Sequence, residues 1–216
     1  MDLPTFSGGG FAENGYLVPC GGDVVVAVDP GAASQGMANA VQEGDLDLRA
    51  IFLTHAHLDH VEGIHRVRAV RPHAPIWLHP ADRPLYQGLA QQAAAFGMPF
   101  TPQPPPDESF EQGQRLTVGE VTFEVRHAPG HAPGHVILVV PEMGAALVGD
   151  VIFQGSIGRT DLPGGDFYTL MDSIRRQVLT LPDEVVLYPG HGPATTVGHE
   201  RVGNPFLAPQ YGGDLA

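Results

Sequence analysis

Residues 54–60 read Thr54-His55-Ala56-His57-Leu58-Asp59-His60, which places four side chains able to bind a metal ion within six residues. In an extended segment, His55 and His57 share one side, so both imidazoles can reach one ion. The turn that follows redirects Asp59 and His60 toward a second ion. The simpler alternative is a solvent-facing, histidine-rich turn in which Asp59 caps a helix. Because the chain has 11 histidines in 216 residues, chance assembly of this spacing is on the order of a few in a thousand.

The residues around this segment predict a strand before it and a helix after it. Residues 50–53 form a short apolar run, which is typical of a buried strand. Beyond the histidines, Val61, Ile64 and Val67 recur at helical spacing. Asp59 stands where the N-cap of that helix is expected, with Glu62 three residues later.

Glycine and proline divide the rest of the chain into short elements. We expect strands at 16–18, 24–28, 76–78 and 185–188, hairpins at 115–118/121–126 and 136–140/145–148, and helices at 34–41, from Pro80 toward Phe96, and at 167–179. Residues 100–107 carry four prolines and read as an extended connector. We therefore predict one domain, 1–216, of α/β (α+β) class, in which pseudo-halves of roughly 1–99 and 108–216 pack two sheets face to face with helices outside.

Three more candidate ligands stand at the ends of predicted strands or in loops set by glycine and proline. His131 lies in Ala128-Pro129-Gly130-His131, Asp150 ends the apolar run 146–149, and His191 stands between Gly190 and Gly192. Each alone is ambiguous, since an aspartate after a strand is more often a turn former. Together with the four candidates in residues 55–60, they give seven candidate ligands for one metal centre.

Composition excludes several classes of function. The formal net charge is −13, and the 11 basic residues, all arginine, form no cluster, so a nucleic-acid partner is not expected. The chain has no apolar run long enough for a membrane span and no basic, apolar leader at Met1-Asp2-Leu3-Pro4, so we expect a cytoplasmic protein without membrane contact. Cys20 is the one cysteine, which excludes a disulfide framework and a multi-thiolate zinc site.

The ordered set of His-x-His-x-Asp-His, His131, Asp150 and Gly190-His191-Gly192 resembles the metallo-β-lactamase superfamily over nearly the whole chain. The resemblance implies a four-layer αββα sandwich. It also implies two divalent metal ions, with zinc as the first expectation and iron or manganese as alternatives. By that resemblance, His55, His57, His131 and Asp150 hold one ion. Asp59, His60, Asp150 and His191 hold the other, and Asp150 bridges.

A finer resemblance is carried by Gly158-Arg159-Thr160-Asp161 and by the tail around Gly198-His199-Glu200-Arg201. Both are similar to short, type II glyoxalase II-like hydroxyacylglutathione hydrolases. This implies hydrolysis of a small-molecule thioester such as S-lactoylglutathione, with Asp59 orienting a metal-bound hydroxide as the nucleophile. Longer members continue into a glutathione-binding helical domain, whereas about 25 residues follow His191 here. His135 is expected to support the ligands, and Arg159 and Arg201 are speculative substrate contacts.

The chemistry of the leaving group agrees with a thioester. An amine must be protonated as it departs, whereas a thiol of pKa about 8.5 can leave as the thiolate. No general acid is evident among the motifs. A thioester therefore suits a site built from metal ligands alone.

Two alternatives come from different classes of function. In a mononuclear iron persulfide dioxygenase, His55, His131 and Asp150 would form a two-histidine, one-carboxylate triad. In a non-catalytic, metal-stabilised binding protein, the ions would serve folding only, although structural zinc sites are usually closed and rich in cysteine. A β-lactamase is less favoured because many members of that branch carry a cysteine where this chain has Asp150. A nuclease is less favoured because the chain is acidic. The sequence does not decide the oligomeric state.

Overall fold

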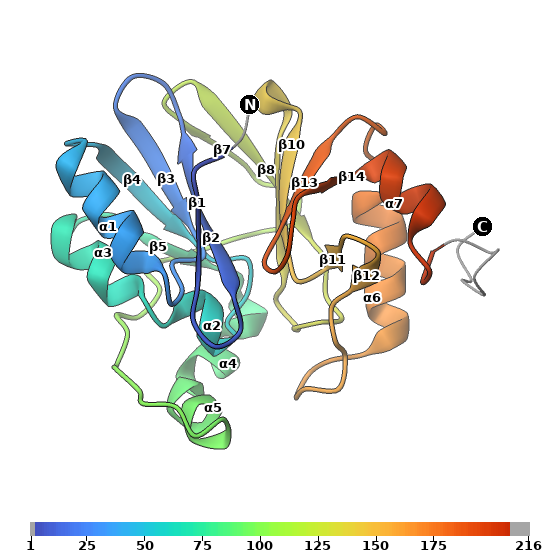
Figure 1. Ribbon diagram of the computed structural model, residues 1–216, viewed down its shortest axis with the longest axis horizontal. Helices are drawn as coiled ribbons and strands as arrows, with labels where there is room; N and C mark the ends of the chain where they lie inside the picture. The colour runs from blue at the N-terminus through green and yellow to red at the C-terminus, as the bar shows by residue number, and fades with distance from the viewer. Residues whose placement is uncertain (1–2, 208–216) are drawn as a thin grey trace.

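Figure 1 shows a computed structural model of the chain, which describes residues 3–207. Met1 and Asp2, which belong to the N-terminal segment considered above for a leader, lie outside the described residues. So do residues 208–216 of the predicted domain. Within residues 3–207, no helix is long and apolar enough to cross a bilayer.

The first sheet has six strands in the order β1-β2-β3-β4-β5-β6. They are β1 (Thr5–Gly8), β2 (Glu13–Pro19), β3 (Val24–Val28), β4 (Asp47–Phe52), β5 (Ile76–Leu78) and β6 (Glu108–Ser109). The first three pair antiparallel, and β3 to β6 pair parallel. The parallel strands β3 and β4 are linked through α1 (Ser34–Glu43), and β4 and β5 through α2 (Leu58–Val61) and α3 (Ile64–Val70).

The second sheet also has six strands, in the order β14-β13-β10-β9-β8-β7. They are β7 (Arg115–Val118), β8 (Val121–His127), β9 (Val136–Val140), β10 (Ala145–Gly149), β13 (Val186–Pro189) and β14 (Thr195–Thr196). All neighbours pair antiparallel except β10 and β13, which pair parallel. The carboxyl ends of β10 and β13 therefore meet at one edge, together with the loop that joins β8 to β9.

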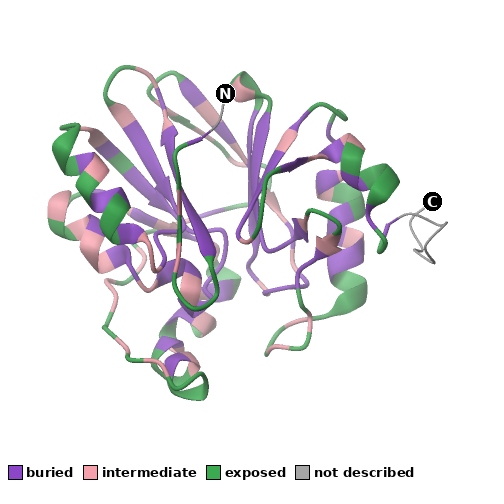
Figure 2. Cartoon of the chain, viewed as in Figure 1, coloured by how far each residue is buried: buried purple, intermediate pink, exposed green. Residues whose placement is uncertain are grey.

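Side chains of the two sheets alternate between separate cores, which explains the unbroken apolar runs of the central strands. In β3, Val25 and Ala27 pack with Met37 of α1, whereas Val26 and Val28 point into the space between the sheets. There the Phe52 ring makes edge contacts with aromatic rings that include Phe123 of the second sheet. A third core lies between the second sheet and α6 (Phe167–Ser173). Figures 1 and 2 show helices outside buried strands, as the αββα prediction requires.

Some predicted elements differ in detail. The expected helix from Pro80 toward Phe96 is a short 3₁₀ turn (Pro80–Asp82) followed by α4 (Arg83–Gln87) and α5 (Leu89–Ala95), because the chain breaks at Gly88. The helix expected at 167–179 is α6 continued by a π-helical turn (Ile174–Val178). The short elements β1, β6, β11 (Ile152–Phe153), β12 (Ser156–Ile157), β14 and α7 (Val197–Gly203) were not predicted.

The predicted N-cap at Asp59 is wrong. α2 begins at Leu58, so that His57 occupies the N-cap position and Asp59 is already inside the first turn. No side chain caps this end of α2. The carboxylate of Asp59 is thus left to face the histidines rather than the backbone of its own helix.

Candidate metal centre

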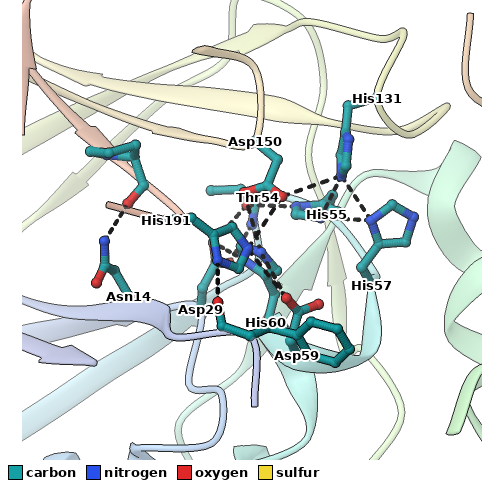
Figure 3. Close-up of polar contacts among 12 residues, drawn as sticks. Asn14, Asp29, Thr54, His55, His57, Asp59, His60, His131, Asp150 and His191 are labelled. Carbon is teal, nitrogen blue, oxygen red and sulfur yellow. Dashed lines mark hydrogen bonds and ion pairs between the residues drawn. The ribbon is translucent and has the colours of Figure 1, made fainter. Parts of the chain in front are cut away.

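Seven side chains from both halves of the chain converge at one place in Figure 3. His55 and His57 follow β4, and Asp59 and His60 lie in α2. His131 comes from the loop between β8 and β9, Asp150 follows β10, and His191 follows β13. The structure therefore brings together every ligand candidate that the sequence predicted.

Three imidazoles form the first group of ligand atoms. His55 Nε2 lies 3.1 Å from His57 Nδ1, His57 Nδ1 lies 2.8 Å from His131 Nε2, and the triangle closes at 3.2 Å between His131 and His55. Ligands about 2.0–2.1 Å from a tetrahedral ion stand roughly 3.3 Å apart. The three nitrogens are thus spaced much as the ligands of one small cation.

The second group combines carboxylates with imidazoles around Asp59, His60 and His191. His191 Nε2 lies 3.3 Å from Asp59 Oδ2, and His60 Nε2 lies 3.9 Å from the same oxygen. Asp150 stands between the groups, with its carboxylate oxygens 3.4 Å from His60, 3.5 Å from His131 and 3.4 Å from His191. One carboxylate therefore touches imidazoles of both groups.

Buried atoms without partners test whether these residues fit metal ions. His60 Nε2 and Asp150 Oδ1 are both buried and, within the described chain, have no hydrogen-bond partner. An unpaired buried polar atom costs about 1–3 kcal/mol, so this arrangement is costly for the protein alone. The His55, His57, His131 set, the His55, His60, Asp150 set and the Asp59, His60, His191 set each bring three ligand atoms within 4.8 Å of one another. Imidazole and carboxylate donors suit zinc, iron and manganese, so the residues present here fit divalent metal ions.

Burial keeps the first group neutral. Loss of solvation lowers the pKa of His55, His57 and His131, and neighbouring imidazoles lower the pKa of His55 further. A neutral imidazole has a lone pair for a cation, whereas a protonated one repels it. These three side chains are consequently held in the form that binds a metal ion.

The carboxylates set the charge of the second group. Burial alone would raise the pKa of Asp150, but His60 and the other imidazoles outweigh it and hold this pKa well below its usual range. Burial would likewise lower the pKa of His60, yet Asp150 and Asp59 raise it well above the ordinary value. Both shifts mean that positive charge is favoured at this point, and a divalent ion can supply it in place of a proton.

Asp29 orients His60 through the ring nitrogen that faces away from the centre. Its Oδ2 accepts a hydrogen bond of 3.0 Å from His60 Nδ1, which leaves His60 Nε2 facing the centre. The same carboxylate accepts the Thr54 N–H at 2.7 Å and the Thr54 hydroxyl at 2.6 Å. A ligand histidine whose other ring nitrogen is held in this way has a fixed tautomer and ring angle.

Backbone carbonyls perform the same task for two other histidines. His131 Nδ1 lies 2.8 Å from the carbonyl oxygen of Arg159, and His191 Nδ1 lies 3.0 Å from that of Phe11. Asn14 and Tyr16 of β2 donate to the Pro189 carbonyl at 3.2 and 2.6 Å and so hold the loop that carries His191. The first strands of the chain thereby position a ligand contributed near its end.

Gly190 leaves room for this packing. A Cβ at this position would collide with Asp150 Oδ1 and with the ring of His60. The glycine before His191 thus serves the close approach of backbone and ligands.

We expect Asp29→Asn to weaken the affinity for one of the ions by about 10- to 100-fold, because the amide cannot accept from all three donors that surround Asp29. Metal affinity is measured by competition with a chromophoric chelator. Asp183→Asn, which alters an exposed pair with Arg201, is the matched control and should leave both affinities unchanged. Equal affinities in Asp29→Asn and the control would contradict this role.

The remaining site predictions fall at different distances from the centre. His135 Nε2 accepts the Asp150 N–H at 2.9 Å, and its ring stacks on His55 at 4.7 Å between centroids. Arg159 lines the pocket described below and pairs with Asp161. Arg201 lies on α7, pairs with Asp183 and is not among the residues that line this pocket.

Sequence reasoning missed Asp29, Asp82 and Gln92. Asp82 is fully buried and accepts the Ala56 N–H at 2.9 Å and the Gly134 N–H, so it ties the loop of His55 to the loop of His131. Gln92 accepts the Leu58 N–H at 3.0 Å and donates to the Ala56 carbonyl at 3.1 Å. Asp29 reads as a turn former in Asp29-Pro30-Gly31, and no local pattern marks the other two.

A pocket of about 350 Å³ opens over the ligands. Its inner part includes His57, Asp59, His131, Asp150 and His191. The rest of its lining is largely apolar and consists of Phe11, Leu58, Phe96, Phe153, Ile157 and Leu162, with Gln92, Ser156 and Arg159. A small molecule can therefore reach the ligands from solvent.

Residues 8–191 match the family model described as the metallo-beta-lactamase superfamily. The chain belongs to this superfamily. The fold prediction is confirmed with it, since the solved structures that the chain resembles share this fold. Members of the superfamily are mostly metal-binding hydrolases, and the chain has the His/Asp cluster that such a metallohydrolase needs.

Individual relatives of the superfamily resemble the chain over most of its length. Hydroxyacylglutathione hydrolase GloC of Haemophilus influenzae is 41% identical over 184 residues, 83% of this chain and 85% of that protein. The crystal structure of TTHA1623 in a di-iron-bound form is 42% identical with a TM-score of 0.87, covering 95% of this chain and 100% of the other. The crystal structure of the B3 metallo-beta-lactamase BLEG-1 is 36% identical with a TM-score of 0.89, over 95% and 99%.

Proposed function

We propose that this metallohydrolase cleaves thioesters of the S-lactoylglutathione type to a hydroxy acid and a free thiol. The observation that carries the proposal is the Asp150 carboxylate, which lies within 3.5 Å of imidazoles from both ligand groups at the base of an open pocket. The 41% identity to a hydroxyacylglutathione hydrolase supports the substrate class.

We propose two divalent ions as cofactors, one held by His55, His57, His131 and Asp150, the other by Asp59, His60, Asp150 and His191. Zinc is the first expectation, and iron gains support from the similar protein crystallised in a di-iron-bound form. Bound there, such ions lower the pKa of water toward about 7 and polarise a carbonyl.

The residues of the chain would then position water and substrate. Asp59 lines the pocket beside His191, and we propose that its carboxylate accepts a hydrogen bond from the attacking water and so fixes the direction of attack. A thiolate leaves without a proton donor, which agrees with the absence of a lysine from the chain and of a tyrosine from the pocket lining within residues 3–207.

The competing functions make different use of the same residues. A mononuclear persulfide dioxygenase needs His55, His131 and Asp150 but gives no role to Asp59, His60 and His191, which lie together as a second group. A purely structural site gives no role to a pocket that opens on the ligands. Likeness to a B3 metallo-beta-lactamase makes β-lactam hydrolysis the outcome to test beside the thioester.

The test is a comparison of substrates on one metal-replete preparation. We expect release of free thiol from S-lactoylglutathione, followed with a thiol reagent, and little turnover of a β-lactam. Oxygen uptake with glutathione persulfide at a single iron would select the dioxygenase. Intact S-lactoylglutathione and intact simpler lactoyl thioesters would refute the proposed function.

A further inference from the structure

Two aromatic side chains stand at the mouth of the pocket. Phe11 comes from the connection between β1 and β2, and Phe96 follows the last residue of α5. Their rings meet edge to face with centroids 5.2 Å apart, and the residues are 40% and 46% exposed. Exposed phenylalanines that line a pocket keep apolar surface in contact with water, which is unfavourable until a ligand covers them.

The positive charge at the same mouth is already compensated. Arg159 is the one arginine among the described residues that line the pocket. Its Nε and one terminal nitrogen each donate to Asp161 at 2.7 Å, which is the two-pronged geometry of a carboxylate complex. A substrate carboxylate would have to compete with Asp161 for this charge, and the formal charge of −13 on the chain opposes the approach of an anion.

Position within the pocket decides which part of a thioester meets these residues. The ligand residues lie at the base, so the reacting carbonyl is placed there. A lactoyl group has three carbons and stays at the base, so the thiol arm is the part that extends to the mouth. There it can contact Phe11, Phe96 and Phe153, whereas the one arginine of the lining is already paired with Asp161.

We propose that the Phe11–Phe96 pair recognises the uncharged section of the thiol arm next to the sulfur, and that no carboxylate on that arm contributes to binding. The substrate class is therefore thioesters of thiols with a neutral stretch next to the sulfur. This inference rests on the proposed function for the identity of the reacting bond.

Phe96 is the better position to test, because Phe11 has a second task. The Phe11 carbonyl holds His191 Nδ1, so a change there disturbs a ligand as well as the mouth. The Phe96 amide makes only a helix-end bond of 3.2 Å to the Gln92 carbonyl, which Phe96→Ala retains. Phe206 is the matched control, since it is a phenylalanine of similar exposure, 41%, outside the pocket lining.

The experiment compares S-lactoylglutathione with its diethyl ester, which keeps the arm but removes both carboxylates. We expect kcat/KM for the diester to equal or exceed that for the free acid. Phe96→Ala should raise KM for both substrates by about tenfold with kcat nearly unchanged, whereas Phe206→Ala changes neither constant. Added salt should not raise KM for the free acid, because no unpaired cation of the pocket lining attracts its carboxylates.

A loss of tenfold or more in kcat/KM on esterification would overturn the proposal, as would an unchanged KM in Phe96→Ala. Dissociation constants of S-hexylglutathione and its diethyl ester are measured by calorimetry in parallel, because binding of these uncleavable thioethers decides the question without turnover. Absence of hydrolysis with tenfold weaker binding to Phe96→Ala would refute the thioester reaction and retain the recognition. Equal binding to Phe96→Ala and wild type would refute the recognition.

Discussion

Asp150→Asn should slow thioester hydrolysis by about a thousandfold, equivalent to roughly 4 kcal/mol of lost transition-state stabilisation. The asparagine keeps the shape of the side chain but removes the charge and one of the two oxygens that lie 3.4–3.5 Å from His60, His131 and His191. With the shared ligand gone, we also expect the metal content to fall from two ions to one or fewer. Both quantities are measured on the same preparation, by thiol release and by elemental analysis.

The matched control for this variant is Asp172→Asn. Asp172 is a surface residue that pairs with Arg176 four positions along its helix, an interaction that contributes little to stability. It should keep two ions and full activity. An Asp150→Asn protein that retains two ions and reacts within tenfold of wild type would show that Asp150 does not bridge.

Removal of the ions should lower the free energy of unfolding by about 4 kcal/mol for each ion that is present at a thousand times its dissociation constant. For a chain of this length, that loss corresponds to a fall in Tm on the order of 10 °C. The physical reason is that His60 Nε2 and Asp150 Oδ1 are buried and have no hydrogen-bond partner within the described chain, so a bound ion would supply the interaction that the fold leaves unmade. Calorimetry of the chelated protein gives the shift.

Re-addition of zinc, iron or manganese to the chelated protein should restore the original Tm. The same chelator saturated beforehand with zinc should have no effect, which controls for action on the protein itself. Identical melting curves with and without ions would mean that the seven side chains stabilise one another without a cation.

The candidate ligand residues could be identified from the sequence because their pattern is local or their setting is distinctive. His55 and His57 alternate in extended chain, and the turn into α2 carries Asp59 and His60 to the other side. His131 and His191 stand in loops punctuated by glycine, and Gly190 is required by the contact that a Cβ would make with Asp150. Such constraints are visible in the residue types themselves.

Asp29, Asp82 and Gln92 could not be predicted as supporting residues because their partners lie far away in the chain. Asp29 bonds Thr54 and His60, 25 and 31 residues later, and Asp82 bonds Gly134 across 52 residues. Asp29 before Pro30 looks like an ordinary turn former. Only the assembled fold reveals that its carboxylate is the partner of a ligand.

Some short elements were not predicted because they too depend on contacts with distant parts of the chain. β6 has two residues, and its pairing with β5 depends on the path of the proline-rich connector rather than on its own sequence. The break at Gly88 interrupts a pattern whose apolar residues on both sides still suit one helix. The predicted cap at Asp59 failed because the carboxylate has stronger partners in His60 and His191 than in its own backbone.

We propose that seven side chains hold two cations, both of which are needed for thioester hydrolysis. The most direct measurement titrates metal-free protein with zinc, iron or manganese and follows thiol release from S-lactoylglutathione at each step. We predict negligible activity at zero equivalents and a plateau at two ions per chain. Full activity without added metal, or a plateau at one equivalent, would contradict it.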